Sequence, residues 1–255
     1  VTATVNGCPS PAGTTSVVVN ATPATPTAAS NSPVCTGSTI SLSTPTVAGA
    51  TYAWTGPNGF TSTAQNPTIP NATTAMAGTY SVTVTGGGCV SGSGTTAVVV
   101  NAIPATPTAA SNSPVCLGSA ITLTTPTVAG ATYAWTGPNG FTSSAQNPTL
   151  PSATAAMAGT YSVTVTTNGC TSPAGTTVVS TKAAPARPGV CANSPVCEGD
   201  SVNLSTPALA GATYAWTGPN GFTSSLQNPT LPNATAAMGG TYSLRVTVGG
   251  CASPA

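Results

Sequence analysis

The 255-residue chain contains no histidine and only 2% charged residues, whereas soluble domains usually carry about 25%. Its two carboxylates, Glu198 and Asp200, stand in one Glu-Gly-Asp turn that we interpret as solvated. This inventory excludes a Ser-His-Asp triad, a zinc cluster and a carboxyl pair in each domain. We therefore predict that the protein is not an enzyme and that it uses no cofactor or metal.

Strong net charge and long apolar runs are also lacking. A net charge of +1 provides no field that would attract nucleic acid or an anionic membrane. The longest strongly apolar runs are of the Val-Val-Val kind, at 17–19 and 98–100, far short of the ~20 residues that span a bilayer. We expect no membrane insertion. The sequence has no initiator methionine or signal peptide, so we expect a processed chain or a part of a longer one.

What the sequence does contain is a repeat with a period of 81 residues. The block YAWTGPNGFTS occurs three times unchanged, and Trp54, Trp135 and Trp216 share one position in it. Cysteines recur with the same period, in two series that are Cys35, Cys116, Cys197 and Cys8, Cys89, Cys170, Cys251. We predict a short segment over 1–21 followed by three repeats over 22–103, 104–183 and 184–255.

Each repeat has the pattern of an all-β domain. Apolar residues alternate in STISLST (38–44), ATYAWTG (50–56) and GTYSVTVT (78–85), and TTAVVVN (95–101) is rich in β-branched residues. Pro, Gly and Asn cluster between these runs. We predict a β-sandwich in which the tryptophans are core residues. The GPNG stretch is interpreted as a hairpin turn with positive φ at Asn and Gly.

The motifs SPVCxGSxxxL, YAWTGPNGFTS and AGTYSVTV, followed by Gly-Cys, resemble the immunoglobulin-like repeats of large surface and secreted proteins of Bacteroidota. The resemblance implies a tandem immunoglobulin-like fold, with Tyr80, Tyr161 and Tyr242 at the tyrosine corners. It also implies a stalk, adhesin shaft or spacer, often exported by the type IX system. Ser201, in Asp200-Ser201-Val202, resembles the short O-glycosylation motif of that phylum.

Eight cysteines without metal partners indicate disulfides and an extracellular location. We favour one bond within each repeat, because each repeat carries both members: Cys35–Cys89, Cys116–Cys170 and Cys197–Cys251. In the immunoglobulin topology, however, these two cysteines lie at opposite ends of the sandwich, and Cα atoms more than ~7 Å apart cannot be bridged. The alternative is a bond to the next repeat, Cys35–Cys170 and Cys116–Cys251.

A surface with so little charge needs hydroxyls, amides or attached sugar to stay in solution. The sequons place possible N-glycans on Asn20, Asn71, Asn203 and Asn233. The Thr/Pro stretches 21–30 and 102–111 are alternative sites for O-glycans.

The third repeat lacks its last strand, while the counterpart GTTSVVVNA stands at 13–21. Two explanations remain open. The chain is a window cut from a longer array, or residues 13–21 of one copy complete the third domain of another by strand addition, which yields a head-to-tail filament. In the second case, Cys8 and Cys191 are candidates for a bond between subunits.

Segment 180–204 holds four of the five charges and the extra Cys191, which indicates either a specific contact or drift in a linker. We predict a structural rod of an extracellular bacterial surface fibre that binds further copies of itself. The alternative is an adhesin whose GPNGF loops and Thr/Asn-rich surface bind glycans with avidity.

Overall fold

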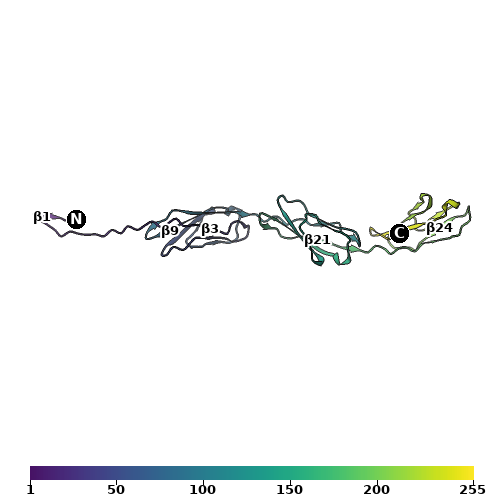
Figure 1. The fold of residues 1–255 in the computed structure, drawn as a ribbon, viewed down its shortest axis with the longest axis horizontal. Coiled ribbons are helices and arrows are strands. Elements are labelled where there is room, and N and C mark those ends of the chain that lie inside the picture. Colours follow the sequence, from purple (N-terminus) through teal and green to yellow (C-terminus); the bar gives the residue numbers. More distant parts are fainter. The chain divides into compact units, whose positions relative to one another are not determined.

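The computed structural model describes residues 1–255 and is built from short strands and six 3₁₀ turns. Contacts divide the chain into two units. The first comprises residues 1–104 together with 167–171, and the second comprises 105–166 together with 172–255. The chain forms three sandwiches, each with an apolar core of its own. Figure 1 colours the strands along the sequence.

The first unit begins with a small hairpin of β1 (Thr4–Val5) and β2 (Cys8–Pro9), in which Val5 lies opposite Cys8. Residues 10–28 then run without a strand partner, up to the first sandwich. The elements of that sandwich are β3 (Ala29–Ser30), β4 (Val34–Cys35), β5 (Ile40–Ser43), β6 (Thr51–Gly56), η1 (Pro57–Gly59), β7 (Phe60–Ser62), β8 (Thr68–Ile69), η2 (Thr74–Met76), β9 (Gly78–Gly86), β10 (Cys89–Val90), β11 (Gly94–Val98) and β12 (Val100–Asn101).

The first sandwich consists of two antiparallel sheets. One has the order β3-β5-β8, and the other has the order β10-β9-β6-β7 with β11 also paired to β9. The closing strand continues into β12, which pairs in parallel with β4, with Val100 opposite Val34 and Asn101 opposite Cys35. The Tyr80 hydroxyl on β9 donates to the Met76 carbonyl at 2.9 Å, which is a tyrosine corner. The fold is thus an immunoglobulin-like β-sandwich.

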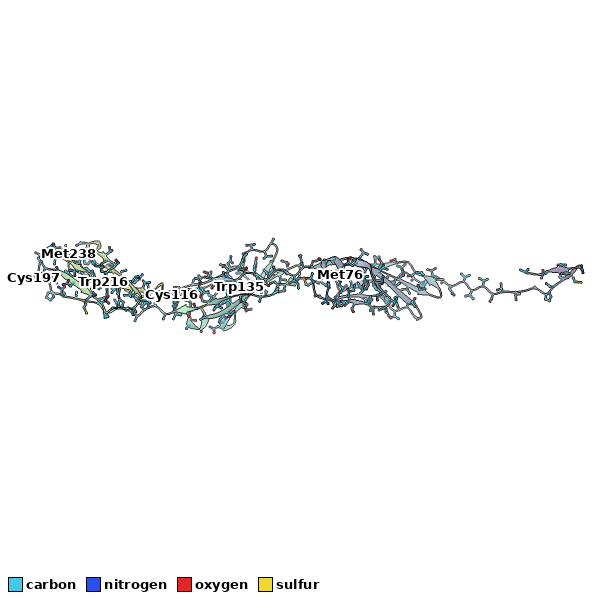
Figure 2. The ribbon with its side chains drawn as sticks, turned by 180° about the vertical axis from the view of Figure 1, so that it is seen from behind. Met76, Cys116, Trp135, Cys197, Trp216 and Met238 are labelled. Atoms are coloured by element: carbon cyan, nitrogen blue, oxygen red, sulfur yellow. A yellow bond between two sulfur atoms is a disulfide. The ribbon has the colours of Figure 1, made fainter.

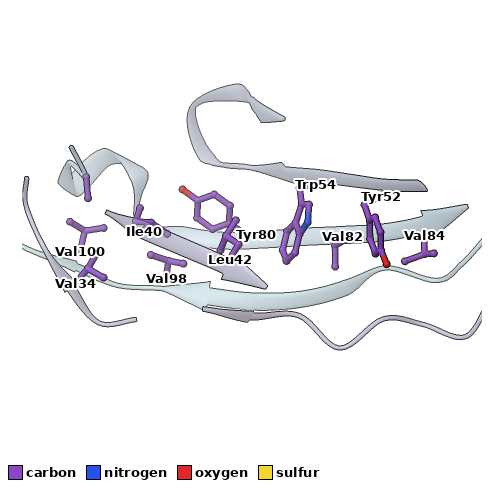
Figure 3. Packing of buried hydrophobic residues seen from close by; sticks show 11 residues of the cluster. Val34, Ile40, Leu42, Tyr52, Trp54, Tyr80, Val82, Val84, Val98 and Val100 are labelled. Carbon is purple, nitrogen blue, oxygen red and sulfur yellow. The ribbon is translucent and has the colours of Figure 1, made fainter. Parts of the chain in front are cut away.

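The core of the first sandwich lies between its sheets (Figure 3). Trp54 on β6 is buried, and its indole N–H donates to the Gln65 carbonyl at 3.1 Å. Figure 3 shows Val98 and Val100 near Val34 toward one end of the cluster and Val84 at the other end, with Trp54 between them. The closing strand therefore contributes side chains to the core as well as hydrogen bonds to the sheet edge.

The second unit contains the other two sandwiches, except for residues 167–171 of the second sandwich, which belong to the first unit. The second sandwich comprises β13 (Ala110–Ser111), β14 (Val115–Cys116), β15 (Ile121–Thr124), β16 (Thr132–Gly137), η3 (Pro138–Gly140), β17 (Phe141–Ser143), β18 (Thr149–Leu150), η4 (Ala155–Met157), β19 (Gly159–Thr167), β20 (Cys170–Thr171), β21 (Gly175–Val179) and β22 (Thr181–Lys182). The third comprises β23 (Cys191–Ala192), β24 (Val202–Ser205), β25 (Ala212–Thr217), η5 (Pro219–Gly221), β26 (Thr223–Ser224), β27 (Thr230–Leu231), η6 (Ala236–Met238), β28 (Ser243–Val248) and β29 (Cys251–Ala252).

The three GPNG stretches form identical turns. Asn58 has φ 55° and Gly59 has φ 70°, as the sequence predicts for a turn between β6 and β7. The following Phe60 packs edge-to-face on Tyr80, with ring centroids 5.6 Å apart. The loop thereby fastens the hairpin to the tyrosine corner.

Candidate functional site: the open edge of the third sandwich

Two disulfides connect neighbouring repeats. Cys35 is bonded to Cys170 and Cys116 is bonded to Cys251, with Cα–Cα distances of 5.7 and 5.6 Å. The favoured pairing within each repeat, Cys35–Cys89, Cys116–Cys170 and Cys197–Cys251, is therefore wrong, and the alternative pairing is the one formed. In the first sandwich, Cys89 lies opposite Gly86 at the end of β9. The chain from Val98, which lies opposite Gly78 at the start of β9, continues to Asn101, which lies opposite Cys35. The two cysteines are therefore at opposite ends of the sandwich, and the hairpin of the following repeat supplies the partner of Cys35.

In the first unit, Asn101 connects the two cysteines of the joint. It lies opposite Cys35 in the parallel β4–β12 pair. Its side-chain amide donates to the Asn168 carbonyl at 3.0 Å. The backbone carbonyl oxygen of Asn101 lies 3.8 Å from the Cys170 sulfur. This role of Asn101 was not predicted from the sequence, although the residue recurs in VVVN at 98–101 and 17–20.

The residues before the first sandwich reproduce half of this joint. Asn20 stands 81 residues before Asn101, and its side-chain amide donates to the Gly87 carbonyl at 2.7 Å. The Cys89 sulfur lies 3.5 Å from the Asn20 carbonyl oxygen. Asn20 thus contacts the hairpin of the first repeat in the same way as Asn101 contacts the hairpin of the second repeat.

The third sandwich has the motif cysteine of a joint, Cys197, and no strand within residues 1–255 takes the place of β11 or β21 in it. In the first two sandwiches, β11 pairs with residues 78–82 of β9, and β21 pairs with residues 159–163 of β19. In the third, β28 has no such partner and begins only at Ser243, so that residues 240–242 are not in a strand. An unpaired edge leaves backbone donors and acceptors free for another strand.

The end of the third sandwich is correspondingly open. Val34 and Val115 are buried in their sandwiches, whereas the equivalent Val196 is half-buried and the adjacent Cys197 is exposed. A groove of about 330 Å³ runs between the segment around Val196 and the η6 turn, and it reaches the half-buried Tyr242. Figure 2 shows Cys197 and Met238 at this same end.

The segment that resembles the missing strand is exposed in the first unit. Val17, Val18 and Val19 have exposed fractions of 81%, 80% and 89%. In the first sandwich their counterparts alternate, because Val98 and Val100 are buried at 2% and 7% while Val99 is exposed at 51%. Residues 13–20 therefore match a closing strand in sequence, but their valine side chains are exposed.

The beginning of the closing strand requires glycine. A Cβ atom on Gly94 would lie 1.8 Å from the Pro26 carbonyl oxygen, and one on Gly175 would lie 1.7 Å from that of Pro107. A Cβ atom on the equivalent Gly13 would meet its nearest atom at 3.7 Å, which is ordinary contact. Gly13 thus matches the glycine that begins a closing strand, although its surroundings leave room for a larger side chain.

The aromatic residues that could have formed sugar platforms are buried or half-buried. Each of the three tryptophans is buried, with its indole N–H hydrogen-bonded to a backbone carbonyl. The corner tyrosines Tyr80, Tyr161 and Tyr242 each donate to a methionine carbonyl at 2.9 Å. Each GPNGF phenylalanine packs edge-on against its corner tyrosine. No observation at these positions favours glycan binding.

The predicted modification sites lie on the surface. Asn20, Asn71, Asn203 and Asn233 are exposed, and Ser201 is half-buried. Glycans on these residues stay predictions. Within the turn interpreted as solvated, Glu198 accepts a hydrogen bond from the Ala236 N–H at 3.1 Å, at the start of η6.

Four cysteines carry free thiols. Cys8, Cys191 and Cys197 are exposed, and Cys89 is half-buried. Cys8 belongs to the first unit and Cys191 to the second, in β23 beside β24. The bond between subunits predicted for this pair stays a prediction.

No helix of the chain has the length and apolar character needed to cross a membrane. No protein-family model and no curated protein matches the chain. Its similar solved structures include domains A168–A170 of titin, at 15% identity and TM-score 0.34, covering 92% of each chain. They also include the mouse nectin-like molecule 4 ectodomain (Ig1–Ig3), at 12% identity and TM-score 0.37, with 86% of this chain and 93% of that chain covered. Murine CEACAM1b has 14% identity and TM-score 0.39 over 62% of this chain and 99% of its own.

Proposed function

We propose that the protein is a structural subunit of an extracellular bacterial surface fibre. Copies assemble head to tail when residues 13–20 of one copy dock as the closing strand of the third sandwich of another. The single observation that carries this proposal is the open edge beside β28, for which the chain itself contains a matching strand.

The first two sandwiches supply the register of the docked strand. By equivalence with β11, Gly13 lies opposite Leu244 and Val17 opposite Gly240. By equivalence with β12, Val19 lies opposite Val196 and Asn20 opposite Cys197. Docking pairs the free backbone groups of residues 240–244 and extends β28 to the length of β9.

Docking also buries apolar surface. Val17 and Val19 take the positions of Val98 and Val100 and fill the groove beside Tyr242. Full burial of a valine stabilises by about 1.5–3 kcal/mol, and the new β-ladder adds directional hydrogen bonds. The contact is heterologous, because different surfaces meet, so repeated addition produces a fibre.

An extracellular setting fits the covalent chemistry of the chain. Disulfides join the repeats in sequence, and such bonds persist in oxidising compartments. A load carried along the array passes through sandwiches and these bonds. The chain has only three basic residues, which leaves few sites for trypsin-like proteases.

The test compares two valine substitutions at neighbouring positions. Gly13→Val places a side chain against the counterpart of the Pro26 carbonyl, namely Pro188, and blocks docking. Ala12→Val adds similar volume at a position equivalent to the exposed Ser93. Electron microscopy of the purified full chain is expected to show fibres for wild type and Ala12→Val and single subunits for Gly13→Val. Single subunits in all three samples would overturn the proposed function.

A further inference from the structure

We infer that the fibre joint is closed by a disulfide between Cys197 of one copy and Cys89 of the next. The inference rests on the proposed function, because the two sulfurs meet only when residues 13–20 dock. It identifies the covalent chemistry of the joint, and it assigns a role to two cysteines that have no partner within the chain.

The two bonds already formed define a rule. Each connects the cysteine of the Ser-Pro-Val-Cys motif in one repeat to the hairpin cysteine of the following repeat, 135 residues later. The third repeat has a motif cysteine, Cys197, and the first repeat has a hairpin cysteine, Cys89. When the third repeat of one copy is followed by the first repeat of another, these two cysteines occupy the bonded positions.

The hairpin of the first repeat is already arranged for this bond. Asn20 donates to the Gly87 carbonyl, and its own carbonyl oxygen lies 3.5 Å from the Cys89 sulfur. Asn101 makes the same two contacts with the Asn168 carbonyl and the Cys170 sulfur in the formed joint. The Cys89 thiol is therefore held beside Asn20, at the end of the docking strand, before docking takes place.

Docking then brings in the second sulfur. Asn101 lies opposite Cys35 in the parallel pair, and Cys35 is bonded to Cys170 with their Cα atoms 5.7 Å apart. When Asn20 lies opposite Cys197 in the same register, the Cα atoms of Cys197 and Cys89 come to a similar distance. That distance is within the range that a disulfide spans.

Bond formation is a two-electron oxidation. The two thiols lose two protons and two electrons as the sulfur–sulfur bond forms. A small-molecule disulfide such as oxidised glutathione accepts the electrons and is released as two thiols, by way of a mixed disulfide. The strand docks without this step, and the bond then fixes it in place.

The test uses the full chain in a glutathione redox buffer and follows it by non-reducing denaturing electrophoresis. Wild type is expected to give a ladder of multimers that collapses on reduction. Cys197→Ser and Cys89→Ser are each expected to abolish the ladder, whereas the Cys8→Ser/Cys191→Ser double variant retains it. Peptide mass mapping should find a peptide that joins Cys89 to Cys197.

One further variant separates a templated bond from random coupling of accessible thiols. Gly13→Val keeps both cysteines but blocks docking, so ladder formation should slow by at least ~10-fold as the effective concentration of the thiols falls. An undiminished ladder in Cys197→Ser or in Gly13→Val would overturn the inference.

Electron microscopy of the same samples separates failure of the bond from failure of the proposed function. Fibres of wild type that dissolve into single chains in denaturant, without reductant, would overturn only the disulfide. Absence of fibres would overturn strand docking itself.

Discussion

Cys35 is bonded to Cys170 of the following repeat and not to Cys89 of its own. Each disulfide of this chain therefore connects neighbouring sandwiches and leaves the interior of each sandwich to apolar packing. Neighbouring sandwiches in such an array are connected covalently twice, once by the backbone and once by a disulfide. The same arrangement leaves one motif cysteine, Cys197, and one hairpin cysteine, Cys89, without a disulfide partner.

The glycine that begins each closing strand provides a stability test. Gly94→Ala would place a Cβ atom 1.8 Å from the Pro26 carbonyl oxygen, so either the strand or the preceding segment must move. We expect a loss of about 2–4 kcal/mol in the unfolding free energy of the first sandwich. Denaturant unfolding followed by tryptophan fluorescence measures it.

The matched control is Gly13→Ala, which has the same place in the sequence pattern and open surroundings in the free chain. It should leave the unfolding of the monomer unchanged. Equal effects of the two substitutions would contradict the assigned role of the closing strand.

Removal of one joint should loosen the hairpin tip that it holds. The Cys35→Ser/Cys170→Ser double variant loses the covalent bond at this tip and keeps the hydrogen bond that the Asn101 side-chain amide donates to the Asn168 carbonyl. We expect hydrogen exchange around 168–170 to accelerate by at least ~10-fold, which corresponds to ~1.4 kcal/mol of local stability. The sandwich cores should keep their protection.

The control for that experiment is Cys8→Ser, which alters a free and exposed thiol. Exchange at 168–170 should match wild type in this variant. Slow exchange at the hairpin tip of the double variant would show that the disulfide does not restrain it.

Alkaline pH should destabilise the first two sandwiches through their corner tyrosines. Burial raises the pKa of Tyr80 and of Tyr161 above the ordinary tyrosine value of about 10. A raised pKa in the folded state means that the contribution to stability is fully present below pH ~10 and is lost as pH rises through the folded pKa.

The measurement is the denaturant midpoint between pH 8 and pH ~11.5. The Tyr80→Phe/Tyr161→Phe variant should be less stable at pH 8, because each substitution removes a hydrogen bond of 2.9 Å to a methionine carbonyl, worth about 1 kcal/mol. It should also show a shallower alkaline decline. Parallel declines in wild type and variant would contradict the assignment.

The sequence predicts the fold of this chain well because its signals are local and repeated. Alternation in 78–85 identifies the buried face of β9, and GPNG identifies the turn with positive φ at Asn58. The block YAWTGPNGFTS places Trp54 in the core, where the structure has it. Each of these features depends on residues close together in the chain.

The disulfide pattern joins cysteines that are 135 residues apart, so local sequence signals could not decide which cysteines pair. Counting one pair per repeat favours Cys35–Cys89, but the sandwich separates these residues and the next hairpin supplies Cys170. The role of Asn20 was also missed, because it follows from a tertiary contact with Gly87. Comparison of Asn20 with Asn101 across the 81-residue period was the one sequence signal that could have indicated it.

The most direct test of strand docking compares two substitutions in adjacent valines. Val17 and Val18 are exposed at 81% and 80% in the free chain, so neither Val17→Asp nor Val18→Asp should disturb the monomer. In the docked strand, Val17 faces the core, as Val98 does, and Val18 faces solvent, as Val99 does. Burial of an unpaired carboxylate costs several kcal/mol.

Sedimentation velocity of wild type and both variants under reducing conditions measures the association without the proposed Cys89–Cys197 bond. We expect Val17→Asp to weaken self-association by at least ~100-fold, equivalent to ~2.7 kcal/mol, and Val18→Asp to associate as wild type does. Equal association of the two variants, or a wild-type chain that stays monomeric at ~100 μM, would contradict assembly by strand docking.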